Sequence, residues 1–207
     1  MKKSNSLISI IMNCKNGQKY LEESIKSIIN QNYQKWELIF YNNCSNDNSL
    51  EIVRSFKEQR IKVYNSKKNL SLYDARNKAI LKAKGKYICF CDVDDWWIKS
   101  KLKKQLIEIQ KKNVNLVFSN LNIFNQKTKK KKLFFKGVMP NGKITQTLLD
   151  DYKLGILSVM ISKKIFKKKI FDKRYNIIGD FDFFINLSLK ENFYCIPEPL
   201  AYYRNHE

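Results

Sequence analysis

The chain has 207 residues, of which 43 % are hydrophobic and 13 % aromatic, so it can bury a core as one globular domain and is not a disordered segment. It carries 40 basic and 19 acidic residues, a formal net charge of +21. No apolar run approaches the roughly 20 residues of a transmembrane helix. The apolar start, residues 7–13, is predicted to be a core strand rather than a signal peptide.

Most of the positive charge is lysine, and it gathers in two runs, residues 127–132 and 162–169. Such runs are compatible with a solvated face, with contact to an anionic membrane surface, or with nucleic-acid binding. Because the chain is also rich in Asn and Ile, a compositional bias explains much of the charge, and we expect no nucleic-acid partner. The five cysteines form no CxxC pair, which is typical of reduced thiols. We therefore expect a cytoplasmic protein that can touch the inner face of the membrane.

The first half of the chain alternates apolar runs with amphipathic stretches. Strands are predicted at residues 7–13, 36–41, 61–65 and 86–91, and helices at 16–31, 45–59 and 71–85. Ser45 or Asp47 is the expected N-cap of the second helix, and Gly85 the expected C-cap of the third. This alternation predicts right-handed βαβ units and a mostly parallel central sheet flanked by helices.

The second half is less regular. The pattern predicts a helix at 98–113, one or two strands at 114–124, loop at 127–146, a strand at 156–162, a helix at 180–191 and an extended segment at 193–203. Pro197 and Pro199 should confine that last segment to a sheet edge or a connection. We find no internal repeat and no linker, so the sequence predicts one α/β domain over residues 1–207.

Three carboxylates crowd into four positions in "KYICFCDVDDWW": Asp92, Asp94 and Asp95, directly after the fourth strand. Like charges this close repel one another unless a positive partner lies among them. Ligands of open parallel sheets bind beyond the carboxyl ends of the strands, and Mg²⁺ and Mn²⁺ prefer carboxylate oxygens. A cation that bridges these acids to a diphosphate would resolve the repulsion. The alternative is that Asp94 or Asp95 caps the helix that begins near Ile98, but capping does not explain three acids.

Several motifs, in order, resemble those of the inverting family 2 glycosyltransferases, which have the GT-A fold. They are the opening "SIIMNCKNGQKYLEESIKSIINQNYQKWELIFYNN", the "ARN" helix and DxD element in "SLYDARNKAILKAKGKYICFCDVDDWW", the acidic "IIGDFDFFINLSLK" and the closing "EPLAYYRNH". Together they span almost the whole chain. The resemblance implies a nucleotide-sugar-binding half at residues 1–95 and an acceptor-side half at 96–207.

On the donor side, the resemblance implies that Asn13 and Asn43 line the nucleoside pocket and that Asp92 holds the ribose. It implies that Arg76, in "ARN", reaches the nucleotide or its phosphates. The expected donor is a nucleotide-diphospho sugar, most simply a UDP-sugar, and the expected acceptor a glycan or a lipid-linked sugar.

For the chemistry, the resemblance implies that Asp94 and His206 ligate Mn²⁺ or Mg²⁺. It makes Asp180 the general base that takes the proton of the acceptor hydroxyl, although Asp180 could instead only cap its helix. An inverting displacement needs such a base and stabilisation of the departing diphosphate, but no covalent nucleophile. Asp182 is read as a solvent-facing or acceptor-site acid.

The sequence departs from the family pattern in two places. Asn42 and Asn43 stand where relatives have paired acids, and Asn186 replaces a basic residue of the acidic helix. The chain ends directly after the YRxH element, as expected of a minimal enzyme or of a fragment. Two other functions stay open: a nucleotidyltransferase on a similar scaffold, which the lack of a Gly-rich phosphate loop disfavours, and a non-catalytic nucleotide- or polyanion-binding module.

Overall fold

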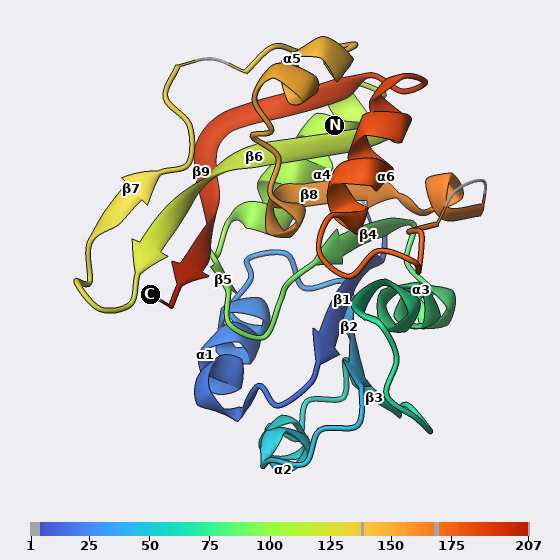
Figure 1. Ribbon diagram of the computed structural model, residues 1–207, viewed down its shortest axis with the longest axis vertical. Coiled ribbons are helices and arrows are strands. Elements are labelled where there is room, and N and C mark those ends of the chain that lie inside the picture. Colours follow the sequence, from blue (N-terminus) through green and yellow to red (C-terminus); the bar gives the residue numbers. More distant parts are fainter. Residues whose placement is uncertain (1–4, 138, 168–169, 207) are drawn as a thin grey trace.

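The apolar start of the chain forms β1 (Ile8–Cys14), which lies inside the sheet with buried side chains on both faces. It pairs in parallel with β2 (Trp36–Asn42) on one side and with β4 (Tyr87–Phe90) on the other. Alternate residues of a strand point to opposite faces, so Ile10 and Ile11 join two separate core clusters. The computed structural model describes residues 5–137, 139–167 and 170–206 (Figure 1).

The sheet runs in the order β3-β2-β1-β4-β8-β6-β9-β5, and β7 pairs with β6. Its remaining strands are β3 (Ile61–Asn65), β5 (Trp96–Trp97), β6 (Leu116–Asn125), β7 (Lys131–Leu133), β8 (Val159–Ser162) and β9 (Phe193–Asn205). The four longest ladders are parallel, and the antiparallel ones, which involve β5, β7 and β8, are short. The expected α/β domain with a mostly parallel sheet is confirmed.

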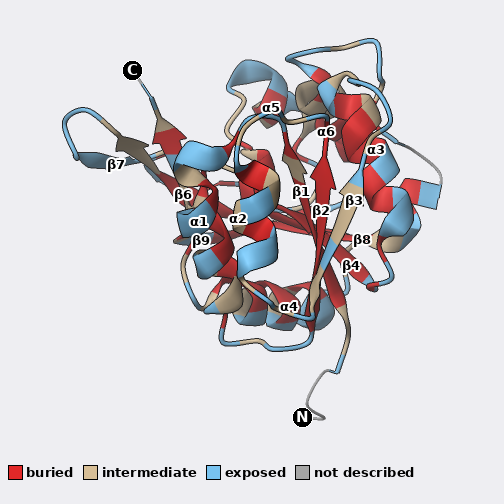
Figure 2. Ribbon diagram, turned by 90° about the horizontal axis from the view of Figure 1, so that it is seen from below, coloured by how far each residue is buried: buried red, intermediate tan, exposed pale blue. Residues whose placement is uncertain are grey.

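Helices cover both faces of the sheet (Figure 2). They are α1 (Gln18–Ile29), α2 (Ser49–Ser55), α3 (Leu72–Lys82), α4 (Lys101–Lys111), α5 (Thr145–Asp150) and α6 (Gly179–Ser188), with short 3-10 turns η1 (Ile156–Ser158) and η2 (Lys163–Lys167). The apolar side chains of α1 and α4 join one core cluster, and those of α3, α5 and α6 join the other. Burial on both faces explains why the central strands are continuous apolar runs. No helix in residues 5–137, 139–167 or 170–206 is long and apolar enough to cross a membrane.

The prediction that Gly85 caps α3 is wrong. The helix ends at Lys82, and its C-cap is Ala83 in an extended conformation. Gly85 is needed for another reason: a Cβ atom there would lie 2.6 Å from the Ser9 backbone nitrogen. The Gly85 N–H donates to the Ser9 hydroxyl at 2.7 Å, and that hydroxyl donates to buried Glu37 at 2.6 Å. Glycine therefore allows the chain to enter β4 in direct contact with β1.

Two helices begin later than the sequence predicts. α2 begins at Ser49, and its N-cap is Asn48, so the prediction of Ser45 or Asp47 is wrong. The Asp47 carboxylate accepts from the Ser49 N–H at 3.0 Å, whereas the Ser45 hydroxyl accepts from the Asn16 N–H. α4 begins at Lys101 after Ser100, six residues beyond the last aspartate of the DVDD run. Helix capping by Asp94 or Asp95 is thereby excluded, and the aspartates need another explanation.

The C-terminal third differs most from expectation. Residues 116–125 form one strand, β6, and the predicted loop contains β7 and the first two residues of α5. The prolines lie inside β9 rather than on an edge strand: the β6–β9 register shifts between Ile196 and Pro199, so both prolines lie at an irregularity of the ladder. Pro lacks the N–H of a regular ladder, and such irregularities tolerate it. Beyond the prolines, β9 pairs with β5 as well as with β6.

One lysine is buried in the core beneath the DVDD run. Lys101 has 0 % exposed surface, and its Nζ lies 2.7 Å from Gln105 Oε1 and 4.1 Å from the centre of the Trp97 ring. No carboxylate pairs with it in the hydrogen bonds and ion pairs of the described residues. Burial lowers the pKa of Lys101 because the charged form loses its hydration.

This burial predicts a pH-dependent stability. Between the lowered folded pKa and the unfolded pKa of about 10.4, the unfolded chain binds more protons, so the free energy of unfolding should rise with pH. Lys101→Met should remove this rise. In urea unfolding at pH 7 to 10, the stability of K101M relative to wild type should decline as the pH increases, while Lys103→Met on the exposed face of α4 should show no trend. A stability difference between K101M and wild type that does not change with pH would show that burial does not disfavour the charged form of Lys101.

Candidate active site

The site lies at the carboxyl ends of β1 and β4, where the strand order reverses. From β1 the chain first builds β2 and β3 on one side and then returns to add β4 on the other. Adjacent loops diverge at such a switch point and leave a crevice for a ligand. Asn13 lies near the end of β1, Asn43 follows β2, and Asp92 follows β4. The topology thus brings the predicted donor-side residues to one edge of the sheet.

A cavity of about 360 Å³ at this edge collects four charged residues: Arg76, Asp92, Asp95 and Asp180. Its walls are largely apolar, with Ile123, Phe134, Leu154 and Ile156 among the lining residues. Asp92 and Asp180 are 88 positions apart in the sequence; Asp92 follows β4, and Asp180 lies in α6. The structure therefore places the predicted ribose-binding acid and the predicted base in one cavity.

Arg76 is the positive partner of Asp92. Its Nη2 donates to Asp92 Oδ1 at 3.0 Å, and only 3 % of the Arg76 side chain is exposed. The guanidinium carbon lies 5.5–5.7 Å from the ring centres of Tyr73, Phe90 and Phe171. A buried guanidinium needs a counter-charge, and Asp92 supplies it. Enclosure raises the pKa of Asp92, and the Arg76 charge acts in the opposite direction.

Asp95 is a structural acid. It is 2 % exposed, its Oδ1 accepts the Arg204 backbone N–H at 3.0 Å, and its carbonyl accepts the Ser24 hydroxyl at 2.5 Å. Burial, followed by the charges of Asp92 and Asp94, raises the pKa of Asp95 well above its ordinary range. Asp95 thus ties the DVDD loop to both α1 and β9.

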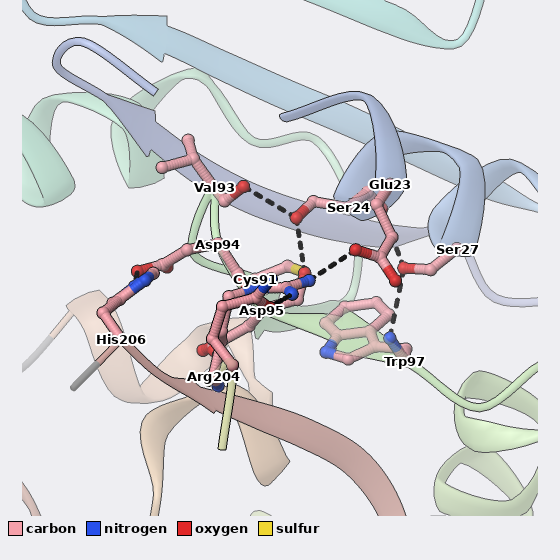
Figure 3. Close-up of polar contacts among 11 residues, drawn as sticks. Glu23, Ser24, Ser27, Cys91, Val93, Asp94, Asp95, Trp97, Arg204 and His206 are labelled. Carbon is pink, nitrogen blue, oxygen red and sulfur yellow. Dashed lines mark hydrogen bonds and ion pairs between the residues drawn. The ribbon is translucent and has the colours of Figure 1, made fainter. Parts of the chain in front are cut away.

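Arg204 of the YRxH element joins three parts of the chain, a role that was not predicted from the sequence (Figure 3). Its Nε donates to the Asp94 carbonyl at 2.8 Å, Nη1 to Gln126 Oε1 at 2.6 Å and Nη2 to Glu23 Oε2 at 2.5 Å. The guanidinium also lies 4.3–4.4 Å from the ring centres of Tyr20 and Trp96. The sequence did carry a signal: an arginine in a recurring motif beside an aromatic pair is suited to a buried planar contact.

Asp94, in the DVDD loop, and His206, which follows β9, contact each other directly. His206 Nε2 lies 2.7 Å from Asp94 Oδ2, with 45 % and 34 % of the two side chains exposed. A carboxylate oxygen and an imidazole nitrogen are both metal ligands. Among residues 5–137, 139–167 and 170–206, no group of three or more His, Cys, Asp or Glu side chains could enclose a metal. The structure thus brings together the two residues predicted to ligate the metal, which are in direct hydrogen-bonding contact.

The two asparagines differ in their surroundings. The Asn43 amide is occupied: it donates to the Leu70 carbonyl at 2.9 Å and accepts from the Leu70 N–H at 3.0 Å. Both amide atoms of Asn13 are buried and have no hydrogen-bond partner among the described residues. Because buried polar atoms are normally satisfied, the Asn13 amide is suited to bind a ligand with one donor and one acceptor.

Asp180 lies in the first turn of α6, and the helix begins at Gly179. Its Oδ1 lies 3.1 Å from the Tyr73 hydroxyl. Asp182, in contrast, accepts from Asn186 at 2.9 Å and lines a separate surface groove. Asp180 is therefore the acid of this helix that faces the charged cavity.

The tryptophans that follow the DVDD run pack as walls. Trp96 stacks on Tyr202 with 4.8 Å between ring centres and 7° between planes. Trp97 is 3 % exposed and lies in the core. The five cysteines are free, and Cys89 and Cys91 are buried in and just after β4, with no place in the cavity lining.

Comparison with known proteins identifies the family. The family model described as "Glycosyl transferase family 2" matches residues 9–179. The chain belongs to this family. The match begins in β1 and ends at the residue before Asp180, so it includes Asp92, Asp94 and Arg76.

Curated relatives have similar sequences over most of the chain. The Escherichia coli protein "UDP-Glc:alpha-D-GlcNAc-diphosphoundecaprenol beta-1,3-glucosyltransferase WfgD" is 32 % identical over 77 % of this chain and 61 % of its own length. "Putative teichuronic acid biosynthesis glycosyltransferase TuaG" of Bacillus subtilis is 30 % identical over 76 % of this chain and 63 % of its own. The chain thus matches about three-fifths of each of these relatives.

Solved structures support the GT-A-type fold. Staphylococcus aureus TarS 1-349 in complex with UDP superposes with a TM-score of 0.79 at 20 % identity and covers 96 % of this chain and 60 % of its own. The Pyrobaculum calidifontis mannosyltransferase PcManGT, in complex with GDP-Man and Mn2+, gives a TM-score of 0.71 at 13 % identity over 97 % of this chain and 57 % of its own. At these identities the likeness establishes the fold alone.

The Arg204 contacts predict a large loss of stability when its planar head is removed. Arg204→Lys keeps the charge but cannot make the same set of hydrogen bonds. We expect the free energy of unfolding to fall by about 2 kcal/mol or more in urea titrations. Arg174→Lys is the matched control because Arg174 is 83 % exposed in its pair with Asp172, and it should change little. Equal stabilities of R204K and R174K would contradict the role assigned to Arg204.

Proposed function

We propose that this protein is a metal-dependent inverting glycosyltransferase that moves a sugar from a UDP-sugar to a hydroxyl of a glycan or lipid-linked acceptor in surface polysaccharide synthesis. One observation carries the proposal: Asp180 and the Asp92–Arg76 pair line one cavity. Asp94, which contacts His206, lies two residues after Asp92 in the DVDD loop. An acid for the acceptor and a site for a diphosphate are the two requirements of this displacement.

The donor would bind against the residues 1–95 half. The unpartnered Asn13 amide offers one donor and one acceptor, which match the imide edge of uracil. Asn43 would shape this pocket mainly by holding the Leu70 backbone, to which its amide is hydrogen-bonded. Asp92, held by Arg76, would accept hydrogen bonds from the ribose hydroxyls, while Arg76 lines the cavity where phosphates would enter.

Asp94 and His206 would hold the divalent cation. The imidazole nitrogen is a softer donor than a carboxylate, which favours Mn²⁺ over Mg²⁺. When bound, the cation supplies positive charge that stabilises the departing diphosphate. The link from Arg204 to the Asp94 backbone keeps this carboxylate in place beside His206.

Asp180 would act on the acceptor. As the acceptor oxygen bonds to the anomeric carbon and the bond to the diphosphate breaks, the hydroxyl proton passes to the Asp180 carboxylate. The products are the lengthened acceptor and UDP. The acceptor-side half, residues 96–207, would supply the largely apolar wall that excludes water from this step.

The names of the relatives suggest the acceptor class. The name of the E. coli relative gives a diphosphoundecaprenol-linked sugar as its acceptor, and that of the B. subtilis relative gives teichuronic acid biosynthesis. The exposed lysines at 127 and 129–132, around the β6–β7 turn, are suited to contact an anionic membrane that presents such an acceptor. Lys168 and Lys169 of the second lysine run lie outside the described residues.

Asp180→Asn tests the proposal. The change keeps the shape but removes the base, so UDP release from UDP-glucose or UDP-GlcNAc with GlcNAc-diphosphoundecaprenol should fall by about 10²–10⁴-fold. Stabilisation of the protein by UDP and Mn²⁺ in a thermal-shift assay should stay as in wild type. Asp182→Asn is the matched control two positions away, and it should transfer sugar at near the wild-type rate. Retained transfer by D180N would overturn the assignment of the base.

A further inference from the structure

The N-cap and the first half of α3 contact the segment that leads to Asp180 at three points. The Asn77 amide donates to the Phe171 carbonyl at 2.8 Å and accepts the Phe171 N–H at 3.1 Å. The Ser71 hydroxyl donates to the Lys173 carbonyl at 3.1 Å. Tyr73 then contacts the carbonyl of Ile177 at 2.7 Å, immediately before α6. The position of Asp180 in the cavity is therefore set from α3.

Tyr73 also reaches the carboxylate itself. Its hydroxyl lies 3.1 Å from Asp180 Oδ1, and this is the sole side-chain hydrogen bond of Asp180 within the part of the chain that the structure describes. A phenol has one proton, so it is shared between the Ile177 carbonyl and Oδ1. Burial, followed by the nearby Asp180 charge, raises the pKa of Tyr73, so the hydroxyl keeps that proton at neutral pH. The Tyr73 hydroxyl thus contacts the carboxylate through Oδ1, and Oδ2 makes no side-chain hydrogen bond among the described residues.

The Tyr73 ring has almost no freedom. It is 1 % exposed and stacks on Phe171 with 5.6 Å between ring centres. It also lies directly against Gly179: a Cβ atom at that position would be 2.5 Å from the ring. Only glycine leaves room for this ring beneath the first turn of α6. The contact therefore fixes the direction of the Asp180 side chain as well as its location.

The same helix holds the acid across the cavity. Arg76 lies three residues after Tyr73, on the same face of α3, and pairs with Asp92. One helical turn thus contacts two carboxylates that the proposed reaction uses: Asp92, which follows β4, and Asp180 of α6. Because α3 is a continuous helix, it fixes the spacing between donor site and base.

We propose that Tyr73 is a positioning residue for Asp180 and that this turn of α3 sets the geometry between the sugar donor and the base. The inference rests on the proposed function, since it takes Asp180 as the base. A positioned base speeds the chemical step without changing donor binding.

Tyr73→Phe tests the inference because it keeps the ring and removes the hydroxyl. We expect kcat for UDP release from UDP-glucose, with GlcNAc-diphosphoundecaprenol present, to fall between about tenfold and 100-fold. The KM for UDP-glucose and the thermal stabilisation by UDP and Mn²⁺ should stay within about twofold of wild type. Tyr33→Phe is the matched control: it removes a hydroxyl that donates to the Ser6 carbonyl at 2.6 Å, at the opposite end of β1. Y33F should lose a similar amount of stability and keep its kcat.

The outcomes separate the two claims. If D180N is inactive and Y73F has the kcat of Y33F, the positioning role is overturned and the proposed function stands. If D180N transfers sugar normally, the proposed function itself fails. Should Y73F not fold, Gly179→Ala gives a second test because it displaces the ring but keeps the hydroxyl; it should lower kcat with little change in KM, and a wild-type kcat would overturn the inference.

Discussion

The structure depends on how three carboxylates in four positions are kept together at the end of β4. Each acid has a different partner: Asp92 pairs with the buried Arg76, Asp95 accepts a backbone N–H of Arg204, and Asp94 faces His206. Only Asp95 is fully buried among these contacts, whereas the Asp92 and Asp94 side chains are 36 % and 34 % exposed.

These partners come from distant parts of the chain, so the site exists only when the sheet is complete. Arg76 comes from α3, while Arg204 and His206 come from β9 and its end. The long parallel ladder between β6 and β9, with its irregularity at the prolines, carries the end of the chain back to the DVDD loop. Local unfolding of β9 would break the hydrogen bond from Arg204 to Asp95 and leave the repulsion among the three aspartates uncompensated.

Much of the fold follows from the sequence because its first half obeys simple periodicity. The strands that contain Ile10 and Phe90 are apolar runs buried on both faces, and the order of the motifs was enough to single out Asp92 and Asp180. Other features are set by contacts that no local pattern encodes. Gly85 looked like a helix cap, but its neighbour is the Ser9 backbone; and the function of Tyr73 depends on a residue more than 100 positions away.

The most direct test of the account is nucleotide binding with and without a metal. Thermal unfolding would be measured with UDP, GDP, dTDP, CDP and CMP, each in Mn²⁺ and in EDTA, for wild type and Asp94→Asn. UDP at 100 times its dissociation constant should add about 2.7 kcal/mol to the stability of the wild type in Mn²⁺, and much less in EDTA or in D94N. Equal stabilisation in EDTA, or none by any nucleotide, would contradict the claim that the carboxylates after β4 form a metal–diphosphate site.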